Sequence, residues 1–335
     1  MKIAFFSTKS YDRTHFESEV ARSDHSITFF EDALNMQTAK LVSGYDAVCI
    51  FVNNPMREEL IAKIAELGVE VIALRSAGFN HVDLEACKKH GVTVYRVPAY
   101  SPEAVAEHTV AIMLTLNRKT HKAYNRVREN NYSLEGLTGF NLHDKTVGVI
   151  GTGTIGTAFC KIMKGFGCDI LAFDPYENET VKSIGGTYVD FDNLVEKSDI
   201  ISLHCPLIPQ TRHIIDDKSI EKMKEGVMII NTSRGALIDT TAVINGLKEK
   251  KVGFLGIDVY EQEDDLFFKD LSGEVIQDDE IARLMTFPNV LITGHQAFLT
   301  EEALQQITGT TIQNLTYHEQ GKAVENEVTA EKNIS

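Results

Sequence analysis

The sequence predicts an α/β fold with two domains, each built on a parallel sheet with crossover helices. Three observations lead to this prediction. The chain of 335 residues is too long for one ordinary hydrophobic core. Short β-rich runs alternate with helix-length amphipathic segments almost throughout. A glycine-rich hexapeptide, GTGTIG at 151–156, stands between a strand pattern and a helix pattern.

The first third of the chain has the pattern of a small α/β unit. Its apolar, β-branched runs predict strands at 2–6, 47–52, 69–74 and 92–97. Between them, apolar residues at helical spacing predict helices at 57–67 and 84–90. No linker of glycine and serine follows, so the domain boundary is placed at 98–101, where the second series of elements begins.

A long helix is predicted next, with Ser101 as its cap and Pro102 in its first turn. The second α/β series has predicted strands at 146–150, 169–173, 200–204, 227–231, 254–259 and 290–293. A last helix begins after Thr300, whose hydroxyl can cap it.

Composition narrows the class of protein. The hydrophobic share of 43% and the charged share of 24% are typical of a soluble globular protein. A net charge of -15 argues against nucleic acid and membrane partners. The basic island at 118–128 is interpreted as a solvated or subunit-contact helix face. Five cysteines without a C-x-x-C pair, together with the lack of a signal peptide or an apolar run of 18 residues, predict a cytoplasmic protein.

The hexapeptide at 151–156 fits a dinucleotide-binding turn. Gly151 allows a tight turn, Gly153 allows the backbone to approach a pyrophosphate, and Gly156 allows close packing of helix on strand. Asp174 ends the next predicted strand, where a carboxylate can accept hydrogen bonds from an adenosine ribose and repel a 2′-phosphate. These residues predict NAD rather than NADP. The alternatives are an ordinary glycine turn and an aspartate that forms a turn before Pro175.

Three reactive side chains follow later strands. Arg234 follows 227–231, Glu263 follows 254–259, and His295 follows 290–293. Because ligands bind beyond the carboxyl ends of parallel strands, we expect all three at the edge that holds the cofactor. Each alone has a plainer interpretation as a surface charge or a structural histidine. Four other histidines lack such partners and are interpreted as structural: His81, His108, His204 and His213.

This combination suits the reduction of a 2-keto acid. Arginine offers a planar, permanent cation for a carboxylate, and histidine can give and take a proton near neutral pH. A neighbouring carboxylate favours the imidazolium and fixes its ring. No metal is expected, because metal-ligand motifs are missing from the sequence, and no G-x-S-x-G hydrolase elbow occurs.

Five motifs, in this order along the chain, resemble signatures of the D-2-hydroxyacid dehydrogenases: LRSAGFNHVDL (74–84), GTGTIG (151–156), SLHCPL (202–207), NTSRGALID (231–239) and GHQAF (294–298). The resemblance covers nearly the whole chain and is strongest to the D-lactate dehydrogenases of fermentative bacteria. It implies two Rossmann-like domains, with an NAD-binding domain (100–298) inserted into a discontinuous substrate domain (1–99 plus 299–335).

The resemblance also implies roles for single residues. Arg234 binds the substrate carboxylate, His295 is the acid and base, and Glu263 pairs with His295. Four further residues contact the substrate: Ala77 and Gly78 through their N–H groups, and Tyr100 and Phe298 around its third carbon. Beyond the three glycines, the cofactor is lined by Thr154, Ile155, Asp174, Cys205, Pro206, Thr211, Thr232, Ser233 and Asp258, with Asp258 facing the nicotinamide amide.

Two features favour pyruvate, reduced reversibly by NADH to D-lactate. The long segment between Glu263 and His295 resembles that of lactate-type members, and Phe79 stands where many relatives have a smaller residue. Glyoxylate, hydroxypyruvate, 2-ketobutyrate and phenylpyruvate remain alternative substrates, because a pocket discriminates against one added methylene by only about 1–3 kcal/mol.

A binding protein of the NAD-sensing corepressor type is the alternative from another class of protein. Family members are commonly dimers through the cofactor domain, and 102–130 is the expected contact.

Overall fold

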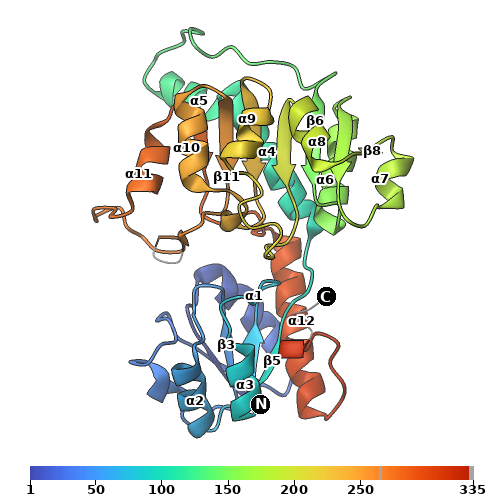
Figure 1. Cartoon of the computed structure of the whole chain (residues 1–335). Helices are drawn as coiled ribbons and strands as arrows, with labels where there is room; N and C mark the ends of the chain where they lie inside the picture. Colours follow the sequence, from blue (N-terminus) through green and yellow to red (C-terminus); the bar gives the residue numbers. More distant parts are fainter. Residues whose placement is uncertain (264–265, 332–335) are drawn as a thin grey trace. The chain divides into compact units, whose positions relative to one another are not determined.

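The computed structural model describes residues 1–263 and 266–331 and confirms the predicted α/β fold with two parallel-sheet domains (Figure 1). One compact unit comprises Met1–Ser101 with Phe298–Ser335, and the other comprises Pro102–Ala297. Among the described helices, none combines the length and the apolar character needed to cross a bilayer.

The first unit is a five-stranded sheet of order β2-β1-β3-β4-β5 in which every pairing is parallel. Its strands are β1 (Lys2–Phe5), β2 (Ser26–Phe29), β3 (Ala47–Ile50), β4 (Val71–Leu74) and β5 (Thr93–Tyr95). Its helices are α1 (Ser10–Val20), η1 (Ala39–Val42), α2 (Glu58–Glu66), α3 (Leu84–His90) and α12 (Glu301–Glu319).

Alternate side chains of these strands fill two separate cores. Ala4, Val48 and Ile72 pack on the side of α2 and α3, whereas Ile3 and Ala47 pack on the side of α1 and α12. The red helix α12 therefore belongs to the same unit as the blue N-terminal strands (Figure 1). This unit is built from both ends of the chain.

The second unit is a seven-stranded parallel sheet of order β12-β11-β10-β9-β6-β7-β8. Its strands are β6 (Thr146–Ile150), β7 (Asp169–Phe173), β8 (Thr187–Tyr188), β9 (Ile200–Leu203), β10 (Val227–Asn231), β11 (Val252–Ile257) and β12 (Val290–Ile292). Its helices are α4 (Pro102–Arg118), α5 (Thr120–Arg128), α6 (Thr154–Gly165), α7 (Glu179–Ser183), α8 (Phe191–Lys197), α9 (Asp217–Lys222), η2 (Gly235–Leu237), α10 (Thr240–Lys248) and α11 (Asp279–Thr286).

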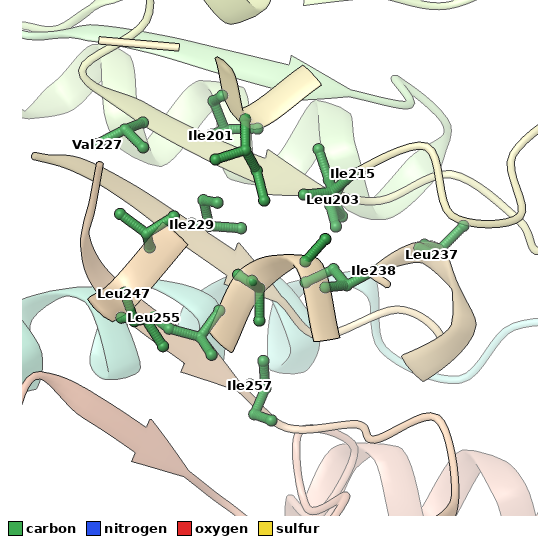
Figure 2. Close-up of a cluster of buried hydrophobic side chains, with 14 of the residues drawn as sticks. Ile201, Leu203, Ile215, Val227, Ile229, Leu237, Ile238, Leu247, Leu255 and Ile257 are labelled. Carbon is green, nitrogen blue, oxygen red and sulfur yellow. The ribbon is translucent and has the colours of Figure 1, made fainter. Parts of the chain in front are cut away.

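Helices cover both faces of this sheet. On one face, strand residues such as Ile229 and Leu255 pack against Leu247 of α10 (Figure 2). On the other face, Val147 and Val149 pack with residues of α4 and α6. A sheet buried on both faces explains why its strands are continuous apolar runs rather than alternating ones.

The boundaries between the units fall at 101/102 and 297/298, so Tyr100 and Phe298, expected at the ends of the NAD-binding domain, lie in the first unit. The physical reason is aromatic packing. The Phe298 ring centroid lies 5.5 Å from that of Phe51 and 6.3 Å from that of Tyr100. Strand β11 also ends at Ile257, earlier than expected, which leaves Asp258 in the loop that follows.

Candidate active site

The glycines of 151–156 have distinct surroundings. Gly151 has φ +94°, and a Cβ there would lie 2.5 Å from the backbone nitrogen of Cys205. A Cβ on Gly156 would lie 2.0 Å from the carbonyl oxygen of Gly151. Gly153, at the N-cap of α6, has open space around its Cβ position. Two glycines therefore serve packing, and the third keeps the start of α6 accessible.

This loop lies at the switch point of the sheet. From β6 the chain runs outward through β7 and β8 and then returns to β9 on the other side of β6. Exposed Thr154 and half-buried Ile155 begin α6 beside that point. A helix N-terminus at a switch point offers free N–H groups and a positive dipole end to a phosphate.

Asp174 follows β7 and faces the same loop. Its Oδ2 accepts hydrogen bonds from the backbone N–H of Thr152 at 2.6 Å and from the hydroxyl of Thr152 at 3.2 Å. Its Oδ1 accepts from the N–H of Tyr176 at 2.9 Å. The carboxylate therefore adjoins the glycine loop. It also stabilises the turn at Pro175, which was the alternative interpretation of Asp174.

The loops after β9 and β10 are tied together. The Ser233 hydroxyl donates to the carbonyl of Cys205 at 2.8 Å, and the Thr211 hydroxyl donates to the carbonyl of Pro206 at 2.6 Å. The hydroxyls of Thr232 and Thr109 share a hydrogen bond of 2.8 Å. Burial raises the pKa of the Cys205 thiol to about 11, so this side chain stays neutral.

Arg234 follows β10, in the turn before η2. The Asn231 amide donates to the Arg234 carbonyl at 2.8 Å, and Nη1 of Arg234 donates to the Ser233 carbonyl at 2.7 Å. At Gly235 a Cβ would lie 2.1 Å from the carbonyl carbon of Tyr260. Glycine here lets the loop that carries Arg234 lie directly against the loop after β11.

Glu263 and His295 form a close pair. Oε1 of Glu263 lies 2.8 Å from Nδ1 of His295, and Oε2 accepts the N–H of Tyr260 at 2.9 Å. The two side chains are only 20% and 19% exposed. His295 has φ +55°, a left-handed conformation that is uncommon for a residue other than glycine. The carboxylate fixes Nδ1 as a donor, which leaves Nε2 as the reactive nitrogen of the ring.

Asp258 anchors the turn that carries His295. Its carboxylate is fully buried and accepts the N–H groups of Gln296 at 2.9 Å and Ala297 at 2.8 Å. Burial by itself would raise the pKa of this carboxyl, but hydrogen bonds from two side chains and two backbone N–H groups hold the pKa below its ordinary value. A charged Asp258 therefore holds together the loop after β11 and the loop after β12.

His108 joins this network, although its sequence pattern indicated only a structural role. Its Nε2 lies 3.2 Å from the Thr293 hydroxyl and 3.4 Å from Oδ1 of Asp258. The Thr293 hydroxyl also donates to Asp258. The available signal was the polar run 107–109 inside α4, in which His108 and Thr109 both contact residues that follow strand ends.

Phe268 is a second residue that sequence reasoning missed. Its ring centroid lies 5.8 Å from that of His295, at an interplanar angle of 37°.

Two other histidines of the second unit have hydrogen-bond partners away from the Glu263–His295 pair. His213 contacts Glu261 at 2.7 Å, and His204 bonds the Ser202 hydroxyl at 2.9 Å. Neither of these contacts involves Glu263 or His295, which agrees with a structural interpretation of both histidines.

In the first unit, Ala77 and Gly78 follow β4. Their carbonyls are occupied by Arg96 at 3.2 Å and by the Ser76 hydroxyl at 2.8 Å. Within residues 1–263 and 266–331, their N–H groups have no acceptor in the protein. Phe79 packs against the core beneath α2 and α3, with the Arg96 guanidinium 5.2 Å from its ring centroid.

The structure therefore brings the predicted residues of the second unit to one edge of its sheet, at the carboxyl ends of β6, β7, β9, β10, β11 and β12. The four predicted substrate residues, Ala77, Gly78, Tyr100 and Phe298, lie in the first unit. Across the described parts of the chain, no group of three or more His, Cys, Asp or Glu side chains is arranged to hold a metal ion.

Comparisons with known proteins identify the family. Residues 110–297 match the family described as D-isomer specific 2-hydroxyacid dehydrogenase, NAD binding domain. A 2-hydroxyacid dehydrogenase homolog of Haemophilus influenzae is 55% identical over 97% of this chain and 98% of its own length. The D-lactate dehydrogenase of Escherichia coli is 53% identical over 98% of this chain and 100% of its own length.

Among solved structures, the pyruvate reductase of Chlamydomonas reinhardtii has a TM-score of 0.94 and 45% identity, and the match covers 97% of this chain and 98% of that one. The family match spans more than half of the chain, and the relatives span nearly all of it. The chain is therefore an NAD-dependent oxidoreductase of the D-isomer specific 2-hydroxyacid dehydrogenase family.

Proposed function

We propose that this protein is a D-lactate dehydrogenase that reduces pyruvate to D-lactate with NADH, and catalyses the reverse reaction. The observation that carries the proposal is the hydrogen bond of 2.8 Å between Glu263 and Nδ1 of His295, at the sheet edge that also holds Arg234. An acid and base, its orienting carboxylate and a carboxylate-binding cation are the groups that a 2-keto acid reduction needs.

Arg234 is proposed to bind the substrate carboxylate and polarise the carbonyl. One of its terminal nitrogens donates to the Ser233 carbonyl, which restrains the guanidinium. A guanidinium suits the flat carboxylate of a keto acid, because both partners are planar and their charges are opposite.

His295 is proposed to protonate the carbonyl oxygen. With Nδ1 hydrogen-bonded to Glu263, Nε2 gives its proton to the oxygen as hydride arrives at the second carbon, and takes a proton back when lactate is oxidised. The same hydrogen-bonded pair therefore serves both directions of the reaction.

The residues at the sheet edge fit NAD. Open space at Gly153 and the start of α6 suit a pyrophosphate, and Asp174 suits an adenosine ribose. When bound, NADH supplies the hydride. The cofactor-lining roles of Thr154, Ile155, Cys205, Pro206, Thr211, Thr232, Ser233 and Asp258 remain part of the proposal.

Residues of the first unit are proposed to bind the substrate. The unoccupied N–H groups of Ala77 and Gly78 can donate to a carboxylate. Tyr100 and Phe298 form an aromatic cluster with Phe51 that can pack against a methyl group. This cluster, together with the half-buried Phe79, is our candidate for substrate selection.

The choice of pyruvate is supported by relatives that are named D-lactate dehydrogenase and pyruvate reductase. The experiment is to compare kcat/KM for pyruvate, glyoxylate, hydroxypyruvate, 2-ketobutyrate and phenylpyruvate by NADH oxidation. Pyruvate should have the highest kcat/KM, and chiral chromatography should identify the product as D-lactate. A higher value for another keto acid would contradict the substrate and leave the family intact. Binding of NADH without turnover of any keto acid would support the corepressor alternative.

The proton donor is tested separately. His295→Gln keeps a hydrogen-bonding side chain but cannot carry the proton, so kcat should fall by about 10²–10⁴-fold. NADH affinity, measured by fluorescence titration, should stay within about 2-fold of the wild type, because His295 is assigned to the substrate. Retained turnover would mean that another group donates the proton.

We further propose a homodimer that forms through the NAD-binding unit. Helix α5 has no buried residue in the single chain, and its Tyr124 and Val127 are 61% and 48% exposed beside basic side chains. The double variant Tyr124→Glu, Val127→Glu should convert a dimer to a monomer in size-exclusion chromatography with light scattering. A wild-type monomer would contradict this proposal.

We infer a cytoplasmic location from the cysteines. All five are free and buried in the structure, which suits a reducing compartment. Fractionation of cells that produce the protein at native level tests this assignment, and activity in a secreted or membrane fraction would contradict it.

A further inference from the structure

We propose that Phe268 is a positioning residue that fixes the plane of the His295 imidazole. The inference rests on the proposed role of His295 as the proton donor. It starts from the contact between the two rings, whose centroids lie 5.8 Å apart with an interplanar angle of 37°. This is the range in which aromatic rings attract one another.

Glu263 alone cannot fix the imidazole. The ring is held at Cγ by its covalent bond and at Nδ1 by one hydrogen bond, and the angular tolerance of that hydrogen bond still lets the ring turn about the Cβ–Cγ bond. Tilting moves Nε2, which lies on the opposite side of the ring, away from the carbonyl oxygen that it must protonate. A second contact, from another ring, removes this freedom, and Phe268 supplies such a contact.

Phe268 is itself held in place. The carbonyl of Glu263 accepts the N–H groups of Leu266 at 3.0 Å and of Phe267 at 2.9 Å. The neighbouring Phe267 is buried in the core beneath α10 and α11. The same glutamate therefore orients His295 with its side chain and the segment of Phe268 with its backbone.

Two uncommon backbone conformations meet at this contact. His295 has φ +55° and Phe268 has φ +65°. A left-handed conformation is unfavourable for a bulky residue and persists only where the surrounding structure holds it. At Phe268 this conformation sets the direction of the ring, so the segment gives up backbone stability to place an aromatic ring beside the imidazole.

The consequence concerns the long segment between Glu263 and His295, which the sequence associated only with lactate-type relatives. Within its described part, Phe268 brings an aromatic ring to the proton donor. A short connection between Glu263 and α11 would lack this residue.

The test uses four variants in the full-length enzyme. Phe268→Ala removes the ring, and kcat should fall about 10-fold while KM for NADH stays within about 2-fold. Phe268→Tyr keeps the ring and should restore at least half of the wild-type kcat. Phe268→Asn removes the ring but tolerates the left-handed backbone, so it should be at least as stable as Phe268→Ala and match it in kcat. Phe267→Leu is the neighbouring control, which should lower stability but keep kcat.

Each outcome decides between the alternatives. If Phe268→Asn keeps the wild-type kcat, or Phe268→Tyr is as slow as Phe268→Ala, the ring does not position His295 and the inference is overturned. If Phe267→Leu lowers kcat as much as Phe268→Ala, general destabilisation explains the loss and the inference is again overturned.

His295→Gln, assayed in parallel, separates the failure of this inference from the failure of the proposed function. An active His295→Gln overturns the proton-donor assignment and this inference with it. If His295→Gln is inactive, the proton-donor assignment stands, and the Phe268 variants alone decide whether the ring positions the imidazole.

Discussion

Gly153 is the N-cap of α6 and Gly156 lies in its first turn, and a methyl group has opposite consequences at the two positions. At Gly156 it would overlap the carbonyl oxygen of Gly151, whereas at Gly153 it would meet open space. Gly153 also has φ −61°, which any residue adopts. We therefore assign the first glycine to ligand binding and the second to the packing of the fold.

This difference predicts a matched pair of variants. Gly153→Ala should unfold at the wild-type temperature but bind NADH at least about 10-fold more weakly, because the methyl group occupies the approach to the backbone. Gly156→Ala should lose about 2 kcal/mol or more of folding stability. Calorimetry and NADH fluorescence measure the two effects. A destabilised Gly153→Ala, or a Gly156→Ala with normal stability, would contradict this division of roles.

At the scale of elements, the end of β9 packs on α6 through a histidine. The His204 ring centroid lies 4.9 Å from that of Phe159, and its Nε2 bonds the Ser202 hydroxyl at 2.9 Å. Burial lowers the pKa of His204 from 6.5 to about 3. The His204 imidazole that makes this contact between strand and helix is therefore neutral.

The free energy of unfolding should therefore depend on pH, and the burial of His204 sets the direction of the change. The unfolded chain takes up a proton at His204 below pH 6.5, whereas the folded chain does not until about pH 3, so the stabilisation is complete above pH 6.5 and declines as the pH falls. Between pH 8 and pH 5 the free energy of unfolding should lose about 2 kcal/mol through this group. In urea titrations, the stability difference between the wild type and His204→Gln should narrow over this range. Parallel curves for the two proteins would contradict the assignment.

Elements differed in how far their sequences predicted them. Helix α2 and most strands of both sheets were predictable because their apolar residues recur at one period or form continuous runs. Helix α1 was missed, since it buries only Asp12 and Phe16 and has no apolar stripe, and β2 was missed as a four-residue edge strand. The contacts of His108 and Phe268 were also beyond the sequence, because tertiary packing, rather than spacing, brings them to Asp258 and His295.

At the scale of the whole molecule, the order of elements along the chain predicted only part of its division into two compact units. The alternation of elements along the chain predicted two parallel sheets. It did not predict that α12 completes the first unit, because α12 and α1 carry no signal of mutual contact in their own patterns. Only the resemblance to a known family predicted that both ends of the chain share one domain.

The second unit has complete cores of its own on both faces of its sheet, which predicts independent folding. A fragment of residues 102–297 should unfold in one cooperative transition and bind NADH. It should show no NADH oxidation with pyruvate, because the proposed substrate residues of the first unit are missing. Circular dichroism, NADH fluorescence and the NADH oxidation assay measure these properties. An unfolded fragment would contradict independent folding of the second unit. A fragment that turns over pyruvate would contradict the proposed role of the first unit in substrate binding.

The first unit, in contrast, depends on both ends of the chain. The Met1 ammonium group bonds Glu319 at 2.7 Å, and Ile312 and Leu315 of α12 pack against Phe5 and Phe16. During synthesis, residues 102–297 leave the ribosome before α12 does, so the second unit can fold while the apolar face of the first stays uncovered. The cofactor-binding half is therefore complete first, and the apolar face of the first unit stays open to aggregation until α12 packs against it.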